Sequence, residues 1–146
     1  MIITRLQLTM VGLVLLSSWT VAAPKPSTNP AVNTVEEFTS AYNSKNLEKL
    51  VSLYASDAIM VSETGIAEGH EAIEARLSAG VKKGNTIEKL YPAKGESSGM
   101  LSYTEGSAEI ISGDQHLRRR YLVVVRTNGP RSEIVLHYSL PVVKQP

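Results

Sequence analysis

The stretch NLEKLVSLYASDAIMVSETGIAEGHEAI, residues 46–73, predicts a helix, a short strand, a turn and a second helix, in that order. Asn46 stands at the N-cap position of the first helix, where its side-chain oxygen can accept a backbone N–H. Asp57 is expected to close this helix, and the apolar run 58–61 is expected to form a buried strand. The helix has one apolar face, because its large apolar residues recur at i, i+3, i+4 and i+7; they are Leu47, Leu50, Val51 and Tyr54.

Further helices are predicted on both sides of this stretch, and strands are predicted after it. One helix should begin near Thr34, whose spacing to Glu37 is that of a capping box, and another should cover about residues 71–78. From residue 86 the hydrophobic period changes from 3.6 to 2. Turn residues then separate four expected strands, 86–91, 100–111, 117–126 and 133–142. Helices followed by a run of antiparallel strands indicate an α+β domain with its helices on one face of the sheet.

This order of elements resembles the NTF2-like superfamily, in particular its DUF4440/SnoaL-like branch. The residues that carry the resemblance are Asn46, Leu50, Leu53, Tyr54, Asp57, Ala58, Val61, Gly65, Gly69, Ala72 and Ile73. The ending H-Y-S-x-P at residues 137–141 is similar to the close of the branch that includes the kinase association domain. Relatives usually carry D-G-x-W at the preceding turn. Here the tryptophan is missing, and Pro-Arg-Ser, residues 130–132, stands in its place. The resemblance implies an NTF2-like cone over residues 34–142, with three N-terminal helices on a curved, mostly antiparallel sheet that encloses a pocket.

The first residues have the pattern of an export signal. Arg5 is followed by a mostly apolar run, 6–19, and by small residues suited to cleavage, which predicts a signal peptide over residues 1–22. The run is shorter than the roughly 20 residues that a spanning helix needs, so no stable membrane anchor is expected after cleavage. A Pro-rich spacer, 23–33, should follow. The expected location is therefore outside the cytoplasm, either periplasmic or secreted.

The composition of the mature chain excludes some functions. Without Arg5 the chain has 14 basic and 14 acidic residues, so a general affinity for nucleic acid is not expected. The sequence has no cysteine and three scattered histidines, which excludes the usual thiolate and HExxH zinc sites. It also lacks a Walker loop, a G-x-G-x-x-G turn and a G-x-S-x-G elbow. No metal and no cofactor are therefore predicted.

His137 is the most prominent single candidate for a functional residue. Strand alternation places it on one face with Val135 and Ser139, and places Tyr138 on the other face with Ile134. If the face of Ile134 points to the core, Tyr138 faces the helices and the pocket, and His137 faces solvent or a partner subunit. His137 is then either a ligand-binding or acid–base group, or a structural histidine that is hydrogen-bonded at an interface.

Tyrosines and one arginine complete the expected pocket. Alternation along residues 118–126 puts Arg118 and Arg120 on one face and Arg119 with Tyr121 on the other, so one arginine should lean inward. It could bind a carboxylate ligand, or it could pair with Glu105 or Glu109. Tyrosine rings with a hydroxyl suit a small organic ligand and also suit an ordinary core. The residues predicted to line the pocket are Tyr42, Tyr54, Arg120, Tyr121, His137 and Tyr138.

Three functions are compatible with these residues. The first is binding of a small organic molecule by an exported homodimer that associates through its sheet. The second is an isomerase, cyclase or dehydratase, because enzymes of the superfamily use an acidic base in the pocket; the weak candidates here are Asp57 and Glu68. The third is an oligomerisation or protein-interaction module. Whether the chain is an enzyme stays open at this point.

Overall fold

The computed structural model describes residues 27–142, so the predicted signal peptide lies outside the described residues. Export stays a prediction. N-terminal sequencing of the protein isolated from its host would test it, and a chain that still starts at Met1 would count against signal-peptide cleavage. The described part contains three helices, α1 (Pro30–Asn43), α2 (Leu47–Ser52) and α3 (Gly69–Lys82). It contains six strands, β1 (Tyr54–Ser62), β2 (Gly65–Glu68), β3 (Thr86–Ser98), β4 (Leu101–Ser112), β5 (Gln115–Asn128) and β6 (Arg131–Pro141).

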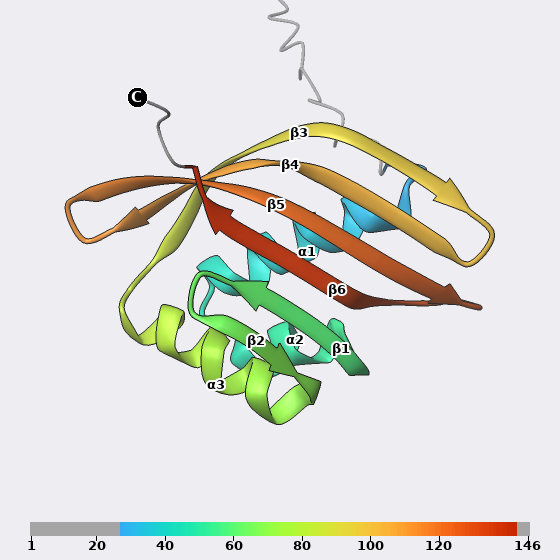
Figure 1. The fold of residues 1–146 in the computed structure, drawn as a ribbon, viewed down its shortest axis with the longest axis horizontal. Coiled ribbons are helices and arrows are strands. Elements are labelled where there is room, and N and C mark those ends of the chain that lie inside the picture. The colour runs from blue at the N-terminus through green and yellow to red at the C-terminus, as the bar shows by residue number, and fades with distance from the viewer. Residues whose placement is uncertain (1–26, 143–146) are drawn as a thin grey trace, which may run out of the picture.

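The six strands form one curved mixed sheet in the order β2-β1-β6-β5-β4-β3 (Figure 1). All neighbouring pairs are antiparallel except β1 and β6, which run parallel. In Figure 1, α1 runs behind the strands and packs against β3, β4, β5 and β6, while α3 packs against β1, β2 and α2. The sheet therefore has an inner face covered by helices and an open face that points to the viewer.

The helices begin and end where local caps and tertiary contacts direct them. Helix α1 begins at Pro30, earlier than predicted, because the side chain of Asn29 accepts a hydrogen bond from the backbone N–H of Ala31 at 2.8 Å. The predicted N-cap of α2 is confirmed, since the Asn46 side chain accepts from the Lys49 N–H at 3.0 Å. None of the helices in residues 27–142 is long and apolar enough to cross a membrane.

Helix α2 ends at Ser52, so the expectation that Asp57 closes it is wrong. The Leu53 carbonyl accepts a hydrogen bond from the Ile134 N–H at 2.7 Å, and Tyr54 then pairs with Ile134 across the parallel β1–β6 junction. The next residues therefore belong to β1, because sheet pairing outweighs the helical periodicity of this segment. The prediction also missed β2, which pairs with β1 to form a hairpin between α2 and α3.

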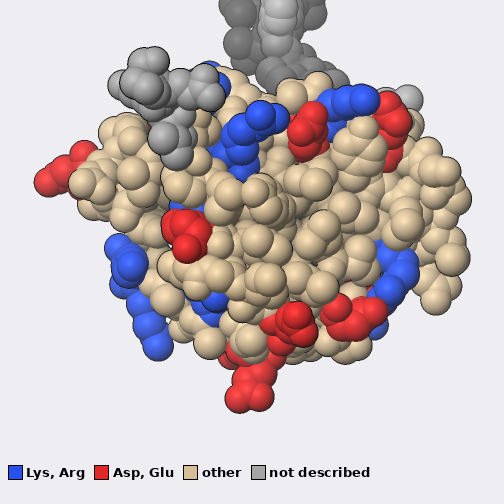
Figure 2. Space-filling view, in the orientation of Figure 1, with Lys and Arg blue, Asp and Glu red and all other residues tan. Residues whose placement is uncertain are grey.

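The open face of the sheet carries a broad uncharged region. Figure 2 shows that its middle is free of Lys, Arg, Asp and Glu side chains, which gather toward its margins. Several large apolar side chains are exposed on the strands of the described chain, and on the open face they include Ile59, Leu101 and Tyr138. Ile66 on β2, which pairs with Val61, is 63% exposed.

Candidate ligand site

A β-bulge in β6 turns His137 toward the helices. Val125 pairs with Ile134 and Val124 pairs with Leu136, so the intervening Val135 has no partner on β5. The extra residue shifts the alternation, and Ile134 and His137 both become buried on the inner face. The expectation that His137 faces away from the Ile134 side is therefore wrong, and so is the expectation that Tyr138 faces the helices.

The buried His137 is paired with Tyr54, the first residue of β1. The Tyr54 hydroxyl and His137 Nδ1 lie 2.6 Å apart, and the ring of Phe38 on α1 meets the His137 ring edge-on at a centroid distance of 5.3 Å. Tyr54 is fully buried. The three rings come from α1, β1 and β6, so they come together only when α1 packs on the sheet and β1 pairs with β6.

Both members of this pair are uncharged at neutral pH. Burial raises the pKa of Tyr54 well above its ordinary value of 10.0. Burial, assisted by the positive charge of Arg119, lowers the pKa of His137 from 6.5 to about 4. A neutral imidazole carries one N–H, so one ring nitrogen donates a hydrogen bond and the other accepts.

Counting hydrogen-bond donors assigns the tautomer of His137. If Nδ1 carried the hydrogen, the buried Tyr54 O–H would have no acceptor among residues 27–142, at a cost of about 1–3 kcal/mol. The Tyr54 hydroxyl therefore donates to Nδ1, and Nε2 carries the hydrogen. In the described chain Nε2 has no hydrogen-bond partner. The fully buried side-chain atoms that lack a partner belong to Asn33, Asn85 and Ser102, so Nε2 is not among them and keeps some accessible surface. His137 Nε2 thus presents an N–H to the adjoining space.

That space is a small apolar cavity between α1 and the inner sheet face, of about 50 Å³. We call it the inner chamber; it is lined by Val35, Phe38, Thr39, Ile87, Leu90, Ala108, Tyr121, Val123, Ile134 and His137. A second space of about 270 Å³, the outer chamber, is lined by Val32, Val35, Glu36, Leu90, Pro92, Thr104 and Tyr121. The two share Val35, Leu90 and Tyr121, so these three side chains stand between them.

Tyr121 forms this partition because a glycine lies beneath it. A Cβ placed on Gly106 would lie 2.7 Å from the Tyr121 hydroxyl oxygen and would also collide with the backbone carbonyl of Tyr91. The ring of Tyr121 can therefore lie against β4 only where the side chain is a hydrogen atom. Burial raises the pKa of Tyr121, so its hydroxyl is also neutral at physiological pH.

Arg119 is the arginine that leans inward, beside His137. Its Nε donates to the Ser139 hydroxyl at 3.0 Å, and its guanidinium forms a two-pronged ion pair with Glu63 in the β1–β2 turn. This hydrogen bonding lowers the pKa of Glu63 to about 2. Because it is held by Glu63 and Ser139, Arg119 ties the β1–β2 turn to β5 and β6 next to the site, and it does not line either chamber.

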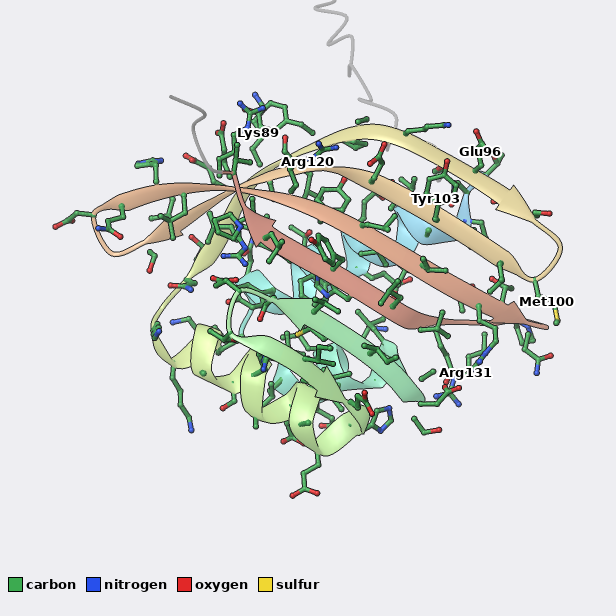
Figure 3. All side chains as sticks on the ribbon, viewed as in Figure 1. Lys89, Glu96, Met100, Tyr103, Arg120 and Arg131 are labelled. Carbon is green, nitrogen blue, oxygen red and sulfur yellow. The ribbon has the colours of Figure 1, made fainter. Side chains whose placement is uncertain are left out.

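Four of the six predicted pocket residues do not line the inner chamber: Tyr42, Tyr54, Arg120 and Tyr138. Arg120, which is labelled in Figure 3, lies on the open face near Glu105, at 3.5 Å, and its side chain is 67% exposed. Tyr138 occupies the same face, since it pairs with Leu122. Both were wrongly expected in the pocket; strand alternation and the β6 bulge explain these positions. Tyr42 stacks on Phe38 at 5.8 Å and rests against Gly80 of α3, next to the site without lining it.

The two acidic candidates do not reach either chamber. Asp57 is exposed on β1, where Arg126 donates to its carboxylate at 2.8 Å and lowers its pKa. A catalytic base of the expected kind needs a raised pKa. The lowered pKa of Asp57 therefore contradicts the expectation that it acts as the base. Glu68 is exposed at the junction of β2 and α3. No group of three His, Asp or Glu residues in the described chain could hold a metal ion.

Phe38 and Gly106 are the site residues that the sequence argument missed. Phe38 lies one helical turn before Tyr42 on the apolar face of α1, and this periodicity could have indicated it. Gly106 interrupts the alternating strand β4, and a glycine inside a strand often marks a close approach of another group. Nothing in the sequence indicates which side chain approaches it.

Comparison with solved structures agrees with this architecture. The chain is similar to an NTF2-like protein of unknown function from Pseudomonas putida, with 15% identity over 75% of this chain and 82% of that one and a TM-score of 0.67. It is similar to an NTF2-like protein with a cystatin-like fold from Novosphingobium aromaticivorans, with 16% identity, coverage of 77% and 79%, and a TM-score of 0.65. A ketosteroid isomerase-like protein from Erwinia carotovora matches with 8% identity, coverage of 75% and 92%, and a TM-score of 0.66.

These likenesses define the class of the protein as an NTF2-like, cystatin-like α+β fold with a curved six-stranded mixed sheet. At these identities they show the fold alone. No family model matches the sequence, and no curated protein matches it.

Proposed function

We propose that this chain binds a small, uncharged or weakly polar organic molecule in the inner chamber, with an oxygen of the ligand accepting a hydrogen bond from His137 Nε2. The observation that supports this proposal is the neutral Tyr54–His137 pair, whose remaining N–H borders an otherwise apolar cavity. Apolar walls with few oriented polar groups are typical of small-molecule sites. Because a cavity needs about 10–15 Å³ by this measure to hold one water molecule, the inner chamber by itself accepts only a group of a few heavy atoms.

Turnover is not part of this proposal. An acid–base reaction needs a proton acceptor at the bound ligand, and the inner chamber is lined by no carboxylate. His137 is a weak base there, because its pKa is about 4 and its Nδ1 already accepts from Tyr54. Placement in the SnoaL-like branch, on the residues of the 46–73 stretch, belongs to the proposal as well.

Binding of hexanol, whose hydroxyl end would enter the inner chamber while its chain extends beyond it, tests the proposal and is followed by NMR chemical-shift changes of residues around His137. A hydrogen bond contributes about 0.5–1.5 kcal/mol, so His137→Phe should weaken hexanol binding about 2- to 13-fold. Tyr54→Phe leaves the tautomer of His137 unspecified and should weaken binding less. The matched control is Tyr138→Phe on the open face, which should bind like the parent chain. Equal affinities of the parent and both inner variants would disprove the proposal.

We also propose that the protein is a homodimer joined through the open sheet face. The support is the uncharged middle of that face together with its exposed apolar side chains, which a second copy would cover (Figure 2). The proposed dimer needs no helix to move, because the helices of residues 27–142 lie on the other face.

A charge placed in the middle of the open face should separate the subunits. Tyr138→Glu should shift the mass seen by native mass spectrometry at micromolar concentration from dimer to monomer, because an unpaired carboxylate would be buried in the interface. The control is Ala75→Glu on the exposed side of α3, which should stay dimeric. A monomeric parent chain, or a dimeric Tyr138→Glu variant, would refute the interface.

A further inference from the structure

The outer chamber has one charged lining residue, Glu36. Val32, Val35 and Glu36 stand on one face of α1, and the opposite wall is built from Leu90, Pro92, Thr104 and Tyr121 of β3, β4 and β5. Every lining residue except Glu36 and Thr104 is apolar or aromatic. A ligand long enough to occupy both chambers displaces the wall that they share, which is formed by Val35, Leu90 and Tyr121, and its far end then lies beside this carboxylate.

The Glu36 carboxylate is exposed and has no ion-pair partner within residues 27–142. Its neighbour Glu37 provides the contrast, since it pairs with Lys49 at 3.0 Å and faces a separate groove between α1, α2 and the β5–β6 turn. Two consecutive carboxylates thus differ in surroundings. Glu36 borders the chamber unneutralised, and Glu37 is neutralised by a lysine.

We propose, on the basis of the proposed binding function, that the ligand is an amphiphilic amine. Its apolar body fills the two chambers, an oxygen at its inner end accepts from His137 Nε2, and an ammonium group at its outer end lies beside Glu36. Each group suits its place, because an apolar, neutral inner chamber penalises a charge and the water-accessible outer end allows the ammonium to stay hydrated. The orientation is set by His137, whose N–H cannot bind an ammonium group, which itself has donors and no acceptor.

Three probes of equal chain length test this inference against the parent chain: hexanol, ω-aminohexanol and ω-hydroxyhexanoate. All three carry the hydroxyl that His137 can bind, and they differ only in the charge at the far end. An exposed ion pair is weak, so ω-aminohexanol should bind about two- to fivefold more tightly than hexanol at low salt. The carboxylate probe should bind more weakly than hexanol. The preference for the amine should shrink as salt is added, because exposed charges are screened.

Matched variants of the two neighbouring glutamates separate this inference from the proposed function. Glu36→Gln should abolish the preference for ω-aminohexanol over hexanol, and Glu37→Gln should keep it. If hexanol binds through His137 but the amine binds no better, or if Glu36→Gln keeps the preference, the amine inference is wrong and the proposed function stands. If none of the probes binds the parent chain, the proposed function fails together with the inference.

Discussion

Between pH 6.5 and pH 4 the folded protein should lose about 3 kcal/mol of its free energy of unfolding. His137 has a pKa of about 4 when folded and an ordinary value of 6.5, so the unfolded chain binds its proton first as the pH falls. Each pH unit between these two values costs about 1.4 kcal/mol. The His137 contribution is fully present above pH 6.5 and is lost as the pH falls toward 4.

Urea unfolding followed by circular dichroism at half-unit pH steps would measure this loss. His137→Asn removes the titrating group and should flatten the dependence between pH 6.5 and pH 4. The matched control is His116→Asn, which replaces an exposed histidine and leaves the His137 contribution to the slope in place. An unchanged slope in His137→Asn would show that another group causes the acid loss.

A second, smaller decline of the free energy of unfolding should follow below pH 4.5, because Glu63 takes up a proton in the unfolded chain before it does so in the folded one. The folded pKa of Glu63 is about 2, mainly because Arg119 donates hydrogen bonds to it. The stability that this ion pair contributes is present above pH 4.5 and is lost as the pH falls through 2. Its size is reduced by solvent screening, because the Glu63 side chain is 47% exposed.

Gly106→Ala should destabilise the fold by about 3 kcal/mol and disturb ligand binding together. The added methyl group would collide with the Tyr91 carbonyl, which belongs to the backbone of β3 and cannot rotate away, and with the Tyr121 hydroxyl. Forcing extra atoms into a packed core costs about 1–3 kcal/mol, and a collision with backbone places this site at the upper end. Chemical denaturation measures the first effect, and hexanol titration measures the second.

Two companion variants identify the cause of the Gly106→Ala effect. Ser107→Ala changes the next residue of β4, whose side chain lies on the open face, and should change stability by less than about 0.5 kcal/mol. Adding Tyr121→Phe to Gly106→Ala removes the hydroxyl and should recover only part of the loss, because the collision with the Tyr91 carbonyl persists. A Gly106→Ala variant as stable as the parent chain would contradict the packing described for Tyr121.

Alternation along a strand predicted side-chain direction well where pairing is regular. Strand β5 pairs with β4 without a register shift, so Tyr121, Val123 and Val125 share the inner face as expected. The expectation of one inward arginine is confirmed by Arg119. The pairing of an arginine with Glu105 is also present, although it is made by the outward Arg120.

The same rule was wrong on β6, because the bulge at Val135 inverts the alternation between Ile134 and His137. A bulge depends on which residues of the neighbouring strand are already paired, and no local pattern in residues 131–141 reveals it. The end of α2 was wrong for a similar reason. Tyr54 continues the helical period of its own segment, yet it pairs with Ile134, 80 positions further along the chain.

The sequence by itself determined the class of fold and most of the elements, although not β2 or the end of α2, since helical and strand periods, caps and turn residues act within a few positions of one another. It also indicated Tyr54, Tyr121 and His137 as site residues, because buried rings with polar groups are uncommon in an otherwise apolar pattern. Only the tertiary structure decided which face each of them occupies and that Tyr138 and Arg120 lie on the opposite side. The neutral state of Tyr54 and His137 also arises there, because it depends on burial by Phe38 and the inner sheet face, which come together only when distant segments pack.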